Sequence, residues 1–285
     1  MQIKALKNIF HQELGNQYDK NEIDEFFYRI LAHYFDIEKI TIALTPEYSL
    51  TNSEVPTIYN ALNQLKKNIP IQYILGKTNF YGADFKVNNH VLIPRPETEE
   101  LVGWILSDIQ NSALKDSLIH ILDIGTGSGC IAVSLAMNTR NAQVSAVDVS
   151  EVALKIAQEN ALRLKANITL EKLDILKTNQ LSERYHIIVS NPPYVRNQEK
   201  TQMQPNVLDH EPHLALFVPD DDALVFYKKI GQLAIHNLFE GGALYFEINQ
   251  YLAESLEYEL KKIGFSQIQL KKDIFGNHRM LKAQI

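Results

Sequence analysis

Two short motifs carry the residue types best suited to chemistry. The first, DIGTGSG, covers residues 123–129, and the second, SNPPY, covers residues 190–194. Glycines let a backbone turn tightly and bring its N–H groups close to a ligand, whereas two prolines after an asparagine hold a side-chain amide on a rigid turn. Together the motifs indicate a small-molecule site beside a site for a planar polar group.

The glycine turn (residues 125–129) follows an apolar run and precedes another. A strand, a glycine-rich turn and a helix in this order bind ligands at the carboxyl ends of parallel strands, although the same turn also occurs as a plain connection. Asp148 favours a ligand, because it ends the next predicted strand, where a carboxylate can accept hydrogen bonds from both hydroxyls of a ribose.

Spacing and charge suggest which ligand this is. The glycines follow Gly-x-Gly-x-Gly rather than the Gly-x-Gly-x-x-Gly of dinucleotide sites, and Asp123 stands just before the turn. A carboxylate there would repel a pyrophosphate but attract an ammonium and a sulfonium, so we predict S-adenosylmethionine rather than a nicotinamide dinucleotide. Asp174 and Ile175 follow the third strand of this sheet and are expected to hold the adenine, unless they are only a loop residue and a core contact.

The NPPY turn (residues 191–194) follows the fourth predicted strand and should lie beside the same cleft. Asn191 offers an acceptor and two donors, Pro192 and Pro193 fix the direction of a carbonyl, and Tyr194 can stack on a flat group. Such a turn can accept both hydrogens of an –NH2 group and leave its nitrogen facing a methyl donor. Because an amide nitrogen is a poor nucleophile, two acceptors that stabilise its developing charge would assist methyl transfer without a strong base. Alone, SNPPY is also compatible with a strand that simply ends in proline.

Strands and helices alternate in the part of the chain that carries these motifs, which predicts a mostly parallel sheet with helices on both faces. The last two strands follow each other without a helix, which predicts an antiparallel edge. The predicted strands are residues 118–124, 143–149, 168–173, 186–190, 243–248, 265–270 and 279–284, and the predicted helices are 130–138, 151–165, 223–238 and 254–263.

The chain before this sheet has a different pattern. Residues 1–75 show apolar side chains at helical spacing, so we predict a small helical domain there. Residues 76–95 hold two short apolar-aromatic runs around Asn88-Asn89, which predicts a β-hairpin that turns at this pair and links the two domains. Residues 96–285 would then form the ligand-binding domain.

Composition excludes several other classes of protein. The chain of 285 residues has a net charge of -6, so it lacks the basic field of a protein that stays on nucleic acid. Its single cysteine, Cys130, excludes an intramolecular disulfide and a Cys-rich zinc site, and the nine histidines show no ligand spacing. With no signal peptide and no apolar run of about 18 residues, we expect a cytoplasmic protein without membrane contact. No His/Asp/Glu cluster shows ligand spacing, so we expect no metal, and no long apolar surface stripe is left over once the helices are assigned, so we expect a monomer.

The order of motifs resembles a known family, the protein-(glutamine-N5) methyltransferases that act on peptide chain release factors. The resemblance covers nearly the whole chain, and the elements that carry it are IPRPETEELV, LDIGTGSGC, AVDVS, IIVSNPPYV, EPHLAL and DIFGNHR. It implies a seven-stranded, Rossmann-like methyltransferase sheet with an N-terminal helical domain for substrate recognition. The implied substrate is the glutamine of the Gly-Gly-Gln motif in release factors 1 and 2.

The resemblance also implies which residues bind. Ile175 stands where the family often has a large aromatic residue, and residues 218–224 lack the glycines of many relatives. RPETE (95–99) either borders the substrate cleft or only begins a helix, and the long segment 196–222 is expected to contact the release factor. Carried over by position, the cofactor residues are Gly125, Thr126, Gly127, Ser128, Gly129, Asp148, Ile175 and Asn191, and the glutamine residues are Asn191, Pro192, Pro193 and Tyr194.

Three alternatives fit the motifs less well. An N6-adenine methyltransferase of DNA or RNA needs the same turn for its –NH2 group, but it also needs a basic track for the nucleic acid backbone, and the lysines and arginines here are scattered. A non-catalytic protein that kept the fold would be expected to have lost part of the glycine turn or the NPPY turn. A dinucleotide oxidoreductase disagrees with Asp123.

Overall fold

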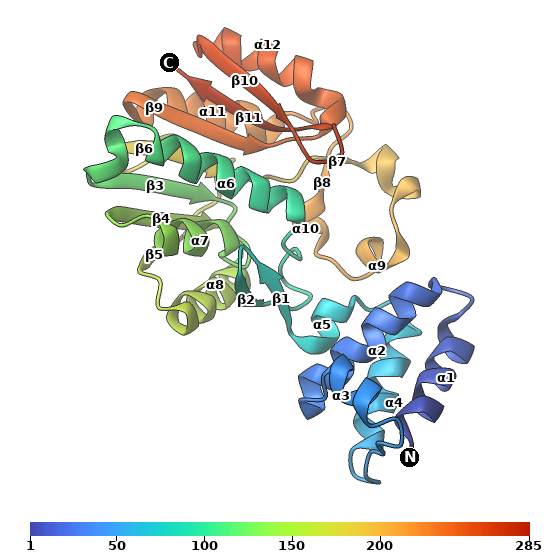
Figure 1. Ribbon diagram of the computed structural model, residues 1–285. Coiled ribbons are helices and arrows are strands. Elements are labelled where there is room, and N and C mark those ends of the chain that lie inside the picture. Colours follow the sequence, from blue (N-terminus) through green and yellow to red (C-terminus); the bar gives the residue numbers. More distant parts are fainter. The chain divides into compact units, whose positions relative to one another are not determined.

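The computed structural model of this chain describes the backbone of residues 1–285 and all side chains except those of Ala113, Asp116 and Gln202. The chain divides into two compact units (Figure 1). One unit comprises Met1–Gly76 and Gln204–His210, and the other comprises Lys77–Met203 and Glu211–Ile285. We call them the helical unit and the sheet unit.

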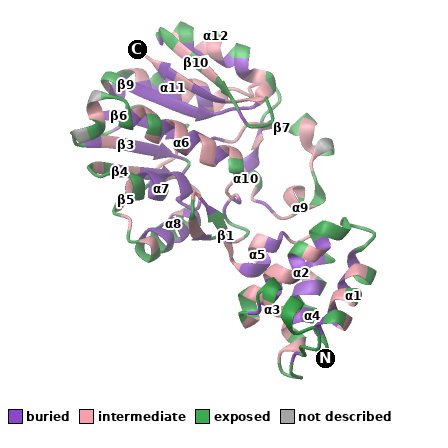
Figure 2. Cartoon of the chain, in the orientation of Figure 1, coloured by how far each residue is buried: buried purple, intermediate pink, exposed green. Residues whose placement is uncertain are grey.

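The helical unit is built from amphipathic helices around an apolar centre (Figure 2). Ile23, Phe27 and Ile30 of the second helix are completely buried, at the helical spacing that the sequence shows. Asp19 begins that helix, since its side chain accepts hydrogen bonds from the backbone of Asn21 and Glu22. The helices are α1 (Ile3–Leu14), α2 (Lys20–Phe35), α3 (Lys39–Leu44), α4 (Val55–Leu65), α5 (Ile71–Leu75) and the short α9 (Pro205–Leu208).

The sheet unit contains the predicted seven-stranded sheet, with strand order β10-β11-β9-β6-β3-β4-β5. The five strands from β9 to β5 are parallel, whereas β11 pairs antiparallel with both β9 and β10, which confirms the antiparallel edge. The strands are β3 (Ile119–Ile124), β4 (Ala142–Asp148), β5 (Ile168–Lys172), β6 (Tyr185–Ser190), β9 (Leu238–Glu247), β10 (Gln267–Lys272) and β11 (His278–Gln284).

Helices cover both faces of this sheet (Figure 1). Neighbouring strand residues alternate between the faces, so that Ile121 joins one apolar cluster and Leu122 the other. The first cluster includes side chains of α6 (Pro96–Gln110) and α7 (Cys130–Asn138), with α8 (Glu151–Leu164) on the same side, and the second includes α11 (Val225–Asn237) and α12 (Ala253–Ile263). The short 3₁₀ helices η1 (Ala113–Asp116) and η3 (Gln250–Leu252) lie between these elements in the chain.

The β-hairpin is present, but its predicted turn is wrong. Strands β1 (Lys77–Phe80) and β2 (Ala83–Lys86) are joined at Tyr81 and Gly82, whose φ angles are 48° and 78°. Two positive φ angles in a two-residue loop match the twist of the strands, and Gly82 adopts its angle at little cost. The Asn88-Asn89 pair lies after β2 instead, where the Asn88 side chain accepts a hydrogen bond from the backbone of His90 at 2.9 Å.

A buried asparagine attaches this hairpin to the sheet unit. Asn160 of α8 accepts a hydrogen bond from the Lys86 backbone N–H at 2.7 Å and donates to the Lys86 carbonyl at 3.0 Å. The same side-chain nitrogen donates to the Ser128 carbonyl in the glycine turn at 2.9 Å. The Arg163 guanidinium donates to the Asn160 Oδ1 as well, at 3.3 Å. All of the hydrogen-bonding capacity of Asn160 is therefore used within the protein, and one side chain joins hairpin, helix and glycine turn.

The segment 196–222 folds into short elements rather than one extended loop. Strands β7 (Val195–Arg196) and β8 (Phe217–Val218) pair in parallel, so that the beginning of the segment lies next to residues near its end. Between them lie η2 (Asn197–Gln202), α9 and α10 (His213–Leu216). In the part of the chain that the structure describes, none of the helices has both the length and the apolar character to cross a membrane.

Candidate active site

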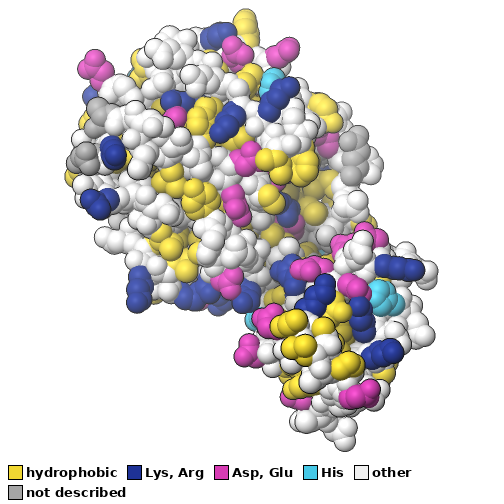
Figure 3. Space-filling view, in the orientation of Figure 1, with side chains coloured by type: hydrophobic (Ala, Val, Ile, Leu, Met, Phe, Trp, Pro, Cys, Tyr) yellow, Lys and Arg dark blue, Asp and Glu magenta, His cyan; other side chains and the backbone are white. Residues whose placement is uncertain are grey.

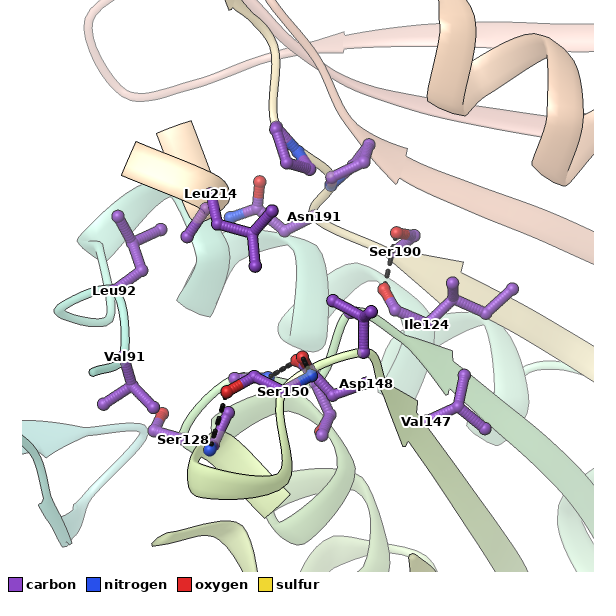
Figure 4. Close-up of a pocket in the computed structure, with 18 of the residues that line it drawn as sticks. Val91, Leu92, Ile124, Ser128, Val147, Asp148, Ser150, Ser190, Asn191 and Leu214 are labelled. Carbon is purple, nitrogen blue, oxygen red and sulfur yellow. Dashed lines mark hydrogen bonds between the residues drawn. The ribbon is translucent and has the colours of Figure 1, made fainter. Parts of the chain in front are cut away.

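A cavity of about 420 Å³ lies at the carboxyl ends of the parallel strands (Figure 4). Its wall includes residues 125–128 of the glycine turn after β3, Asp148 at the end of β4, the loop after β5 and the start of the NPPY turn after β6, whereas Gly129 does not line it. Residues from the segment 90–98, from α10 and from α11 also line it. The two motifs of the sequence therefore meet in one cavity, as expected where parallel strands end together.

The glycine turn requires glycine at the positions that the sequence shows. Gly125, Gly127 and Gly129 have φ angles of 75°, 55° and 80°, which other L-residues adopt only with strain. A Cβ atom on Gly129 would also lie 3.0 Å from the Cβ and 3.2 Å from the Cα of Ala157 in α8, whereas one on Gly125 would meet nothing within 4 Å. At position 125 glycine is required by the backbone conformation alone, whereas at position 129 it is required both by the conformation and by the close packing against α8.

This difference gives a stability prediction. Gly129→Ala is expected to lower the free energy of unfolding by about 2–4 kcal/mol, because backbone strain adds to overpacking against α8. Gly125→Ala is the matched control and should cost only about 1 kcal/mol, the strain alone. Urea unfolding of both variants measures the difference, and equal losses would contradict a close approach of Gly129 to α8.

Asp123 lies behind the glycine turn rather than in the cavity wall. Its Oδ2 accepts hydrogen bonds from the Thr126 hydroxyl at 2.7 Å and from the Ala132 backbone at 3.2 Å. Its Oδ1 is buried and has no partner among the described residues, and burial raises the pKa of this carboxyl to about 7. Asp123 therefore holds the glycine turn to the start of α7. Because Asp123 is not in the cavity wall, its carboxylate would attract a cationic ligand in the cavity only from the other side of the turn.

Asp148 lies in the cavity wall, as the sequence predicts (Figure 4). Its Oδ2 accepts a hydrogen bond from the Gly127 backbone and its Oδ1 one from the Ser150 backbone, both at 2.9 Å. Burial raises the pKa of this carboxyl, whereas these backbone hydrogen bonds oppose the shift. Each oxygen keeps a second lone pair, so the carboxylate can still accept two hydroxyls of a ribose.

The loop after β5 supplies the two residues predicted to hold an adenine, and both line the cavity. Ile175 is 8% exposed and lies between the cavity and the apolar core. Asp174 pairs with the exposed Lys177 at 2.8 Å, which lowers the pKa of its carboxyl. An apolar surface next to a carboxylate suits a flat ring that carries an amine.

The NPPY turn begins at the cavity and leaves it within four residues. Asn191, Pro192 and Pro193 line the cavity, and the Asn191 Nδ2 donates a hydrogen bond to the Thr98 hydroxyl at 3.2 Å. Tyr194 does not line it, because its ring packs against the core and its hydroxyl donates to Glu247 at 3.0 Å. The expected stacking of Tyr194 on a flat substrate group is therefore not what the geometry supports.

Residues of the RPETE and EPHLAL elements, whose contact with each other the sequence analysis did not predict, connect the two sides of the cavity. The Arg95 guanidinium pairs with Glu211 at 2.6 Å, and the second oxygen of Glu211 accepts from the Ile93 backbone at 3.1 Å. Glu211 is only 3% exposed, so its charge is balanced by Arg95 inside the fold. The PRPETE and EPHLAL elements thus contact each other, and RPETE borders the cavity through Arg95 and Thr98.

The side chains in the cavity wall offer donors and acceptors that can bind and orient a ligand. Among the described residues, no group of three or more His, Cys, Asp or Glu side chains could hold a metal ion. The donors and acceptors that face the cavity are suited to a ribose, an adenine and a primary amide, so the residues present fit S-adenosylmethionine next to a planar –NH2 group.

Two solved structures of other proteins have a similar fold. The catalytic domain of hMettl16, in complex with the MAT2A 3′UTR hairpin 1, has a TM-score of 0.53 at 15% identity, over 82% of this chain and 80% of that chain. The T. thermophilus 16S rRNA N2 G1207 methyltransferase, in complex with AdoMet and guanosine, has a TM-score of 0.50 at 19% identity, over 73% of this chain and 49% of that chain. These likenesses show the fold alone.

Sequence comparisons are more specific. A family model described as the PrmC N-terminal domain matches residues 10–76, and one described as the methyltransferase small domain matches residues 105–213. A release factor glutamine methyltransferase of Flavobacterium psychrophilum is 51% identical over 284 residues, which is 99% of either chain. One of Bacteroides thetaiotaomicron is 41% identical over 273 residues, or 95% of this chain and 96% of the relative. By these full-length matches, this chain belongs to the family of release factor glutamine methyltransferases.

Proposed function

We propose that this protein transfers a methyl group from S-adenosylmethionine to the side-chain amide nitrogen, N5, of the glutamine in the Gly-Gly-Gln motif of peptide chain release factors 1 and 2. The observation that carries this proposal is the position of the Asn191 amide, in the same cavity as the glycine turn and Asp148. The names of the full-length relatives support the choice of substrate. When bound, the cofactor would supply an electrophilic methyl group: its carbon–sulfur bond breaks as the bond from that carbon to N5 forms, S-adenosylhomocysteine leaves, and N5 loses one of its two protons to solvent.

The glycine turn and Asp148 would bind the cofactor, with Asp148 accepting from the ribose hydroxyls. Thr126 and Ser128 are 4% and 2% exposed, so we assign them mainly to the shape of the turn. Ile175 would cover the adenine and Asp174 would accept from its amine. This division leaves the NPPY side of the cavity for the substrate glutamine.

The NPPY turn would orient the glutamine amide. The Asn191 Oδ1 and the Pro192 carbonyl are proposed to accept its two N–H groups, and Pro193 keeps that carbonyl in place. Both acceptors stabilise the positive charge that grows on the nitrogen during methyl transfer, and they hold the nitrogen in line with the methyl group. Orientation of this kind can lower a barrier by about 7–11 kcal/mol. Tyr194 would support the turn from the core rather than contact the glutamine.

A shorter substrate side chain gives a direct test. Replacing the Gly-Gly-Gln glutamine of the release factor by asparagine is expected to lower methyl transfer by about 100-fold or more, because the nitrogen is withdrawn from the cofactor by one methylene. Incorporation of labelled methyl groups measures the loss. Replacement by glutamate, which lacks the nitrogen, provides the blank. An asparagine substrate methylated within about tenfold of the natural rate would contradict an orienting role for the NPPY turn.

Two surfaces are proposed to bind the body of the release factor. On the helical unit, α3 has no buried side chain, and Ile40 and Leu44 are 65% and 76% exposed. Figure 3 shows apolar side chains at the surface of this unit among charges of both signs, which is typical of interaction surfaces. The second surface is the segment 196–222. We propose that the enzyme acts as a monomer in the cytoplasm, where release factors work.

The N6-adenine methyltransferase remains the competing hypothesis to test. Several basic side chains of the sheet unit are neutralised by carboxylates, such as Lys77 by Asp84 at 2.8 Å and Lys86 by Glu159 at 2.5 Å. The net charge of -6 also gives the chain no basic field that would release counterions from a nucleic acid backbone. We therefore propose no stable contact with nucleic acid.

A further inference from the structure

A line of hydrogen bonds runs from the cavity into the core beneath the NPPY turn. The Asn191 Nδ2 donates to the Thr98 Oγ1 at 3.2 Å, and the Thr98 hydroxyl donates to the Glu247 Oε2 at 2.5 Å. Thr98 lies in the first turn of α6 and Glu247 ends β9, and they are 2% and 1% exposed. Buried polar groups of this kind are costly unless each has its partner, so their arrangement is strongly determined.

The single proton of the Thr98 hydroxyl decides which side of the Asn191 amide faces the cavity. Because this proton is donated to Glu247, the Thr98 oxygen offers only lone pairs to Asn191. Only the –NH2 side of the Asn191 amide can bind a lone pair, so its Oδ1 is left on the other side. Among the described residues, no hydrogen bond reaches this Oδ1, and Asn191 lies in the cavity wall (Figure 4).

The opposite orientation would prevent the proposed chemistry. An asparagine amide can turn over and exchange its oxygen for its nitrogen with almost no change in shape. The cavity would then meet two N–H donors, which repel the N–H groups of a substrate amide. The Asn191 Oδ1 can accept from the substrate only if the Asn191 –NH2 group is held on the other side, and an acceptor with a fixed position, such as the Thr98 oxygen, is therefore needed beside it.

The carboxylate of Glu247 is linked to both ends of the NPPY turn, directly to Tyr194 and through Thr98 to Asn191. The Glu247 Oε1 accepts from the Tyr194 hydroxyl at 3.0 Å, while its Oε2 accepts from Thr98. Burial raises the pKa of Glu247, whereas these two hydrogen bonds and the positive charge of Arg279 oppose the shift. The prolines between Asn191 and Tyr194 are stiff, so fixing both ends fixes the whole turn.

We propose that Thr98 and Glu247 are positioning residues for methyl transfer, which orient the Asn191 amide so that its oxygen accepts from the substrate glutamine. Neither side chain is assigned a contact with the reacting atoms, since both act through Asn191 and Tyr194. This inference rests on the proposed function, and it identifies the two residues that keep the NPPY turn in the orientation needed for methyl transfer.

Kinetics of Thr98 variants test the proposal. Thr98→Val keeps the shape but loses the hydroxyl, and kcat is expected to fall about 10- to 100-fold while the Kd for S-adenosylmethionine changes less than about threefold. Thr98→Ser keeps the hydroxyl and should retain most of kcat. In an Asn191→Ala background, Thr98→Val should cause no further loss, because its effect passes through Asn191. Equal losses in both backgrounds would overturn the proposal.

A second measurement does not need the release factor. With ¹⁵N-labelled asparagine, the side-chain signal that disappears in Asn191→Ala belongs to Asn191. We expect its N–H groups to exchange slowly in the wild type and in Thr98→Ser, and faster in Thr98→Val. If the wild type methylates no release factor but shows this pattern, the orientation stands and the proposed substrate fails. If methylation occurs and exchange is the same in all three proteins, the positioning role is refuted.

Discussion

Replacing Asn191 by alanine is expected to lower kcat for release factor methylation by about two to three orders of magnitude. The substitution removes an acceptor aimed at the reacting nitrogen, and loss of one such group from a preorganised site has an effect of this size. The Kd for S-adenosylmethionine should change by less than about threefold, because the proposed function assigns the main cofactor contacts to Asp148 and the glycine turn and assigns Asn191 to the substrate. Steady-state kinetics with purified release factor, together with calorimetric titration of the cofactor, separate the two effects.

Asn111→Ala is a suitable control for this variant. Asn111 follows α6 and is exposed, and within the part of the chain that the structure describes its side chain donates a hydrogen bond to Ser107 at 3.4 Å and to no other residue. It lies outside the cavity wall, so kcat should stay near the wild-type value. A kcat for Asn191→Ala that is also near the wild-type value would exclude the orienting role of the NPPY turn.

The second large effect is expected from Asp148→Ala, which should raise the Kd for S-adenosylmethionine by about 100-fold. Hydrogen bonds to a charged acceptor are worth roughly 1.5–3 kcal/mol, and the variant loses those to the ribose. It also leaves the backbone N–H groups of Gly127 and Ser150 without their acceptor, which loosens the glycine turn. At saturating cofactor, kcat should fall much less than in Asn191→Ala.

Glu171→Ala provides the comparison for Asp148, since Glu171 is an exposed acid of the neighbouring strand β5 outside the cavity wall. Its replacement changes the net charge equally without touching the cavity. If both variants bind the cofactor with the wild-type Kd, the ribose role of Asp148 is refuted. If both weaken binding to the same degree, general charge rather than a specific contact would be responsible.

Sequence was sufficient for the parts of the site that depend on local residue type. The glycine turn is recognisable because Gly125, Gly127 and Gly129 adopt positive φ angles that few other residues tolerate. Asp148 and Asn191 are recognisable because each ends a predicted parallel strand, and such ends meet at one edge of the sheet. The alternation of strands and helices predicts a mostly parallel sheet, and the last two strands predict the antiparallel edge at β10 and β11, whereas the order of the strands is known only from the structure.

Contacts between distant segments could not be predicted in this way. Thr98 and Glu247 are 149 positions apart, and Arg95 and Glu211 are 116 positions apart. Nothing in the sequence says which buried polar residue will be the partner of which. The position of the Tyr194 side chain could not be predicted for the same reason, because its hydroxyl donates to Glu247, a residue far away in the sequence.

The prediction of the hairpin turn at Asn88-Asn89 is wrong for a different reason. Asn88-Asn89 has the residue types that favour positive φ angles, whereas Tyr81 adopts a φ of 48° although tyrosine rarely does. The attachment of the hairpin to Asn160 of α8 shows that tertiary contacts act on this segment. Local preference was therefore a poor guide to the turn.

The central claim is that the NPPY turn presents a glutamine amide, rather than a base, to the methyl donor. Its most direct test is a methyl-transfer assay with labelled S-adenosylmethionine, in which purified release factor and bare nucleic acid are offered in parallel. We expect label on the release factor only, and none when the Gly-Gly-Gln glutamine is replaced. Label on nucleic acid alone would contradict the account and identify the protein as an amino-methyltransferase of bases.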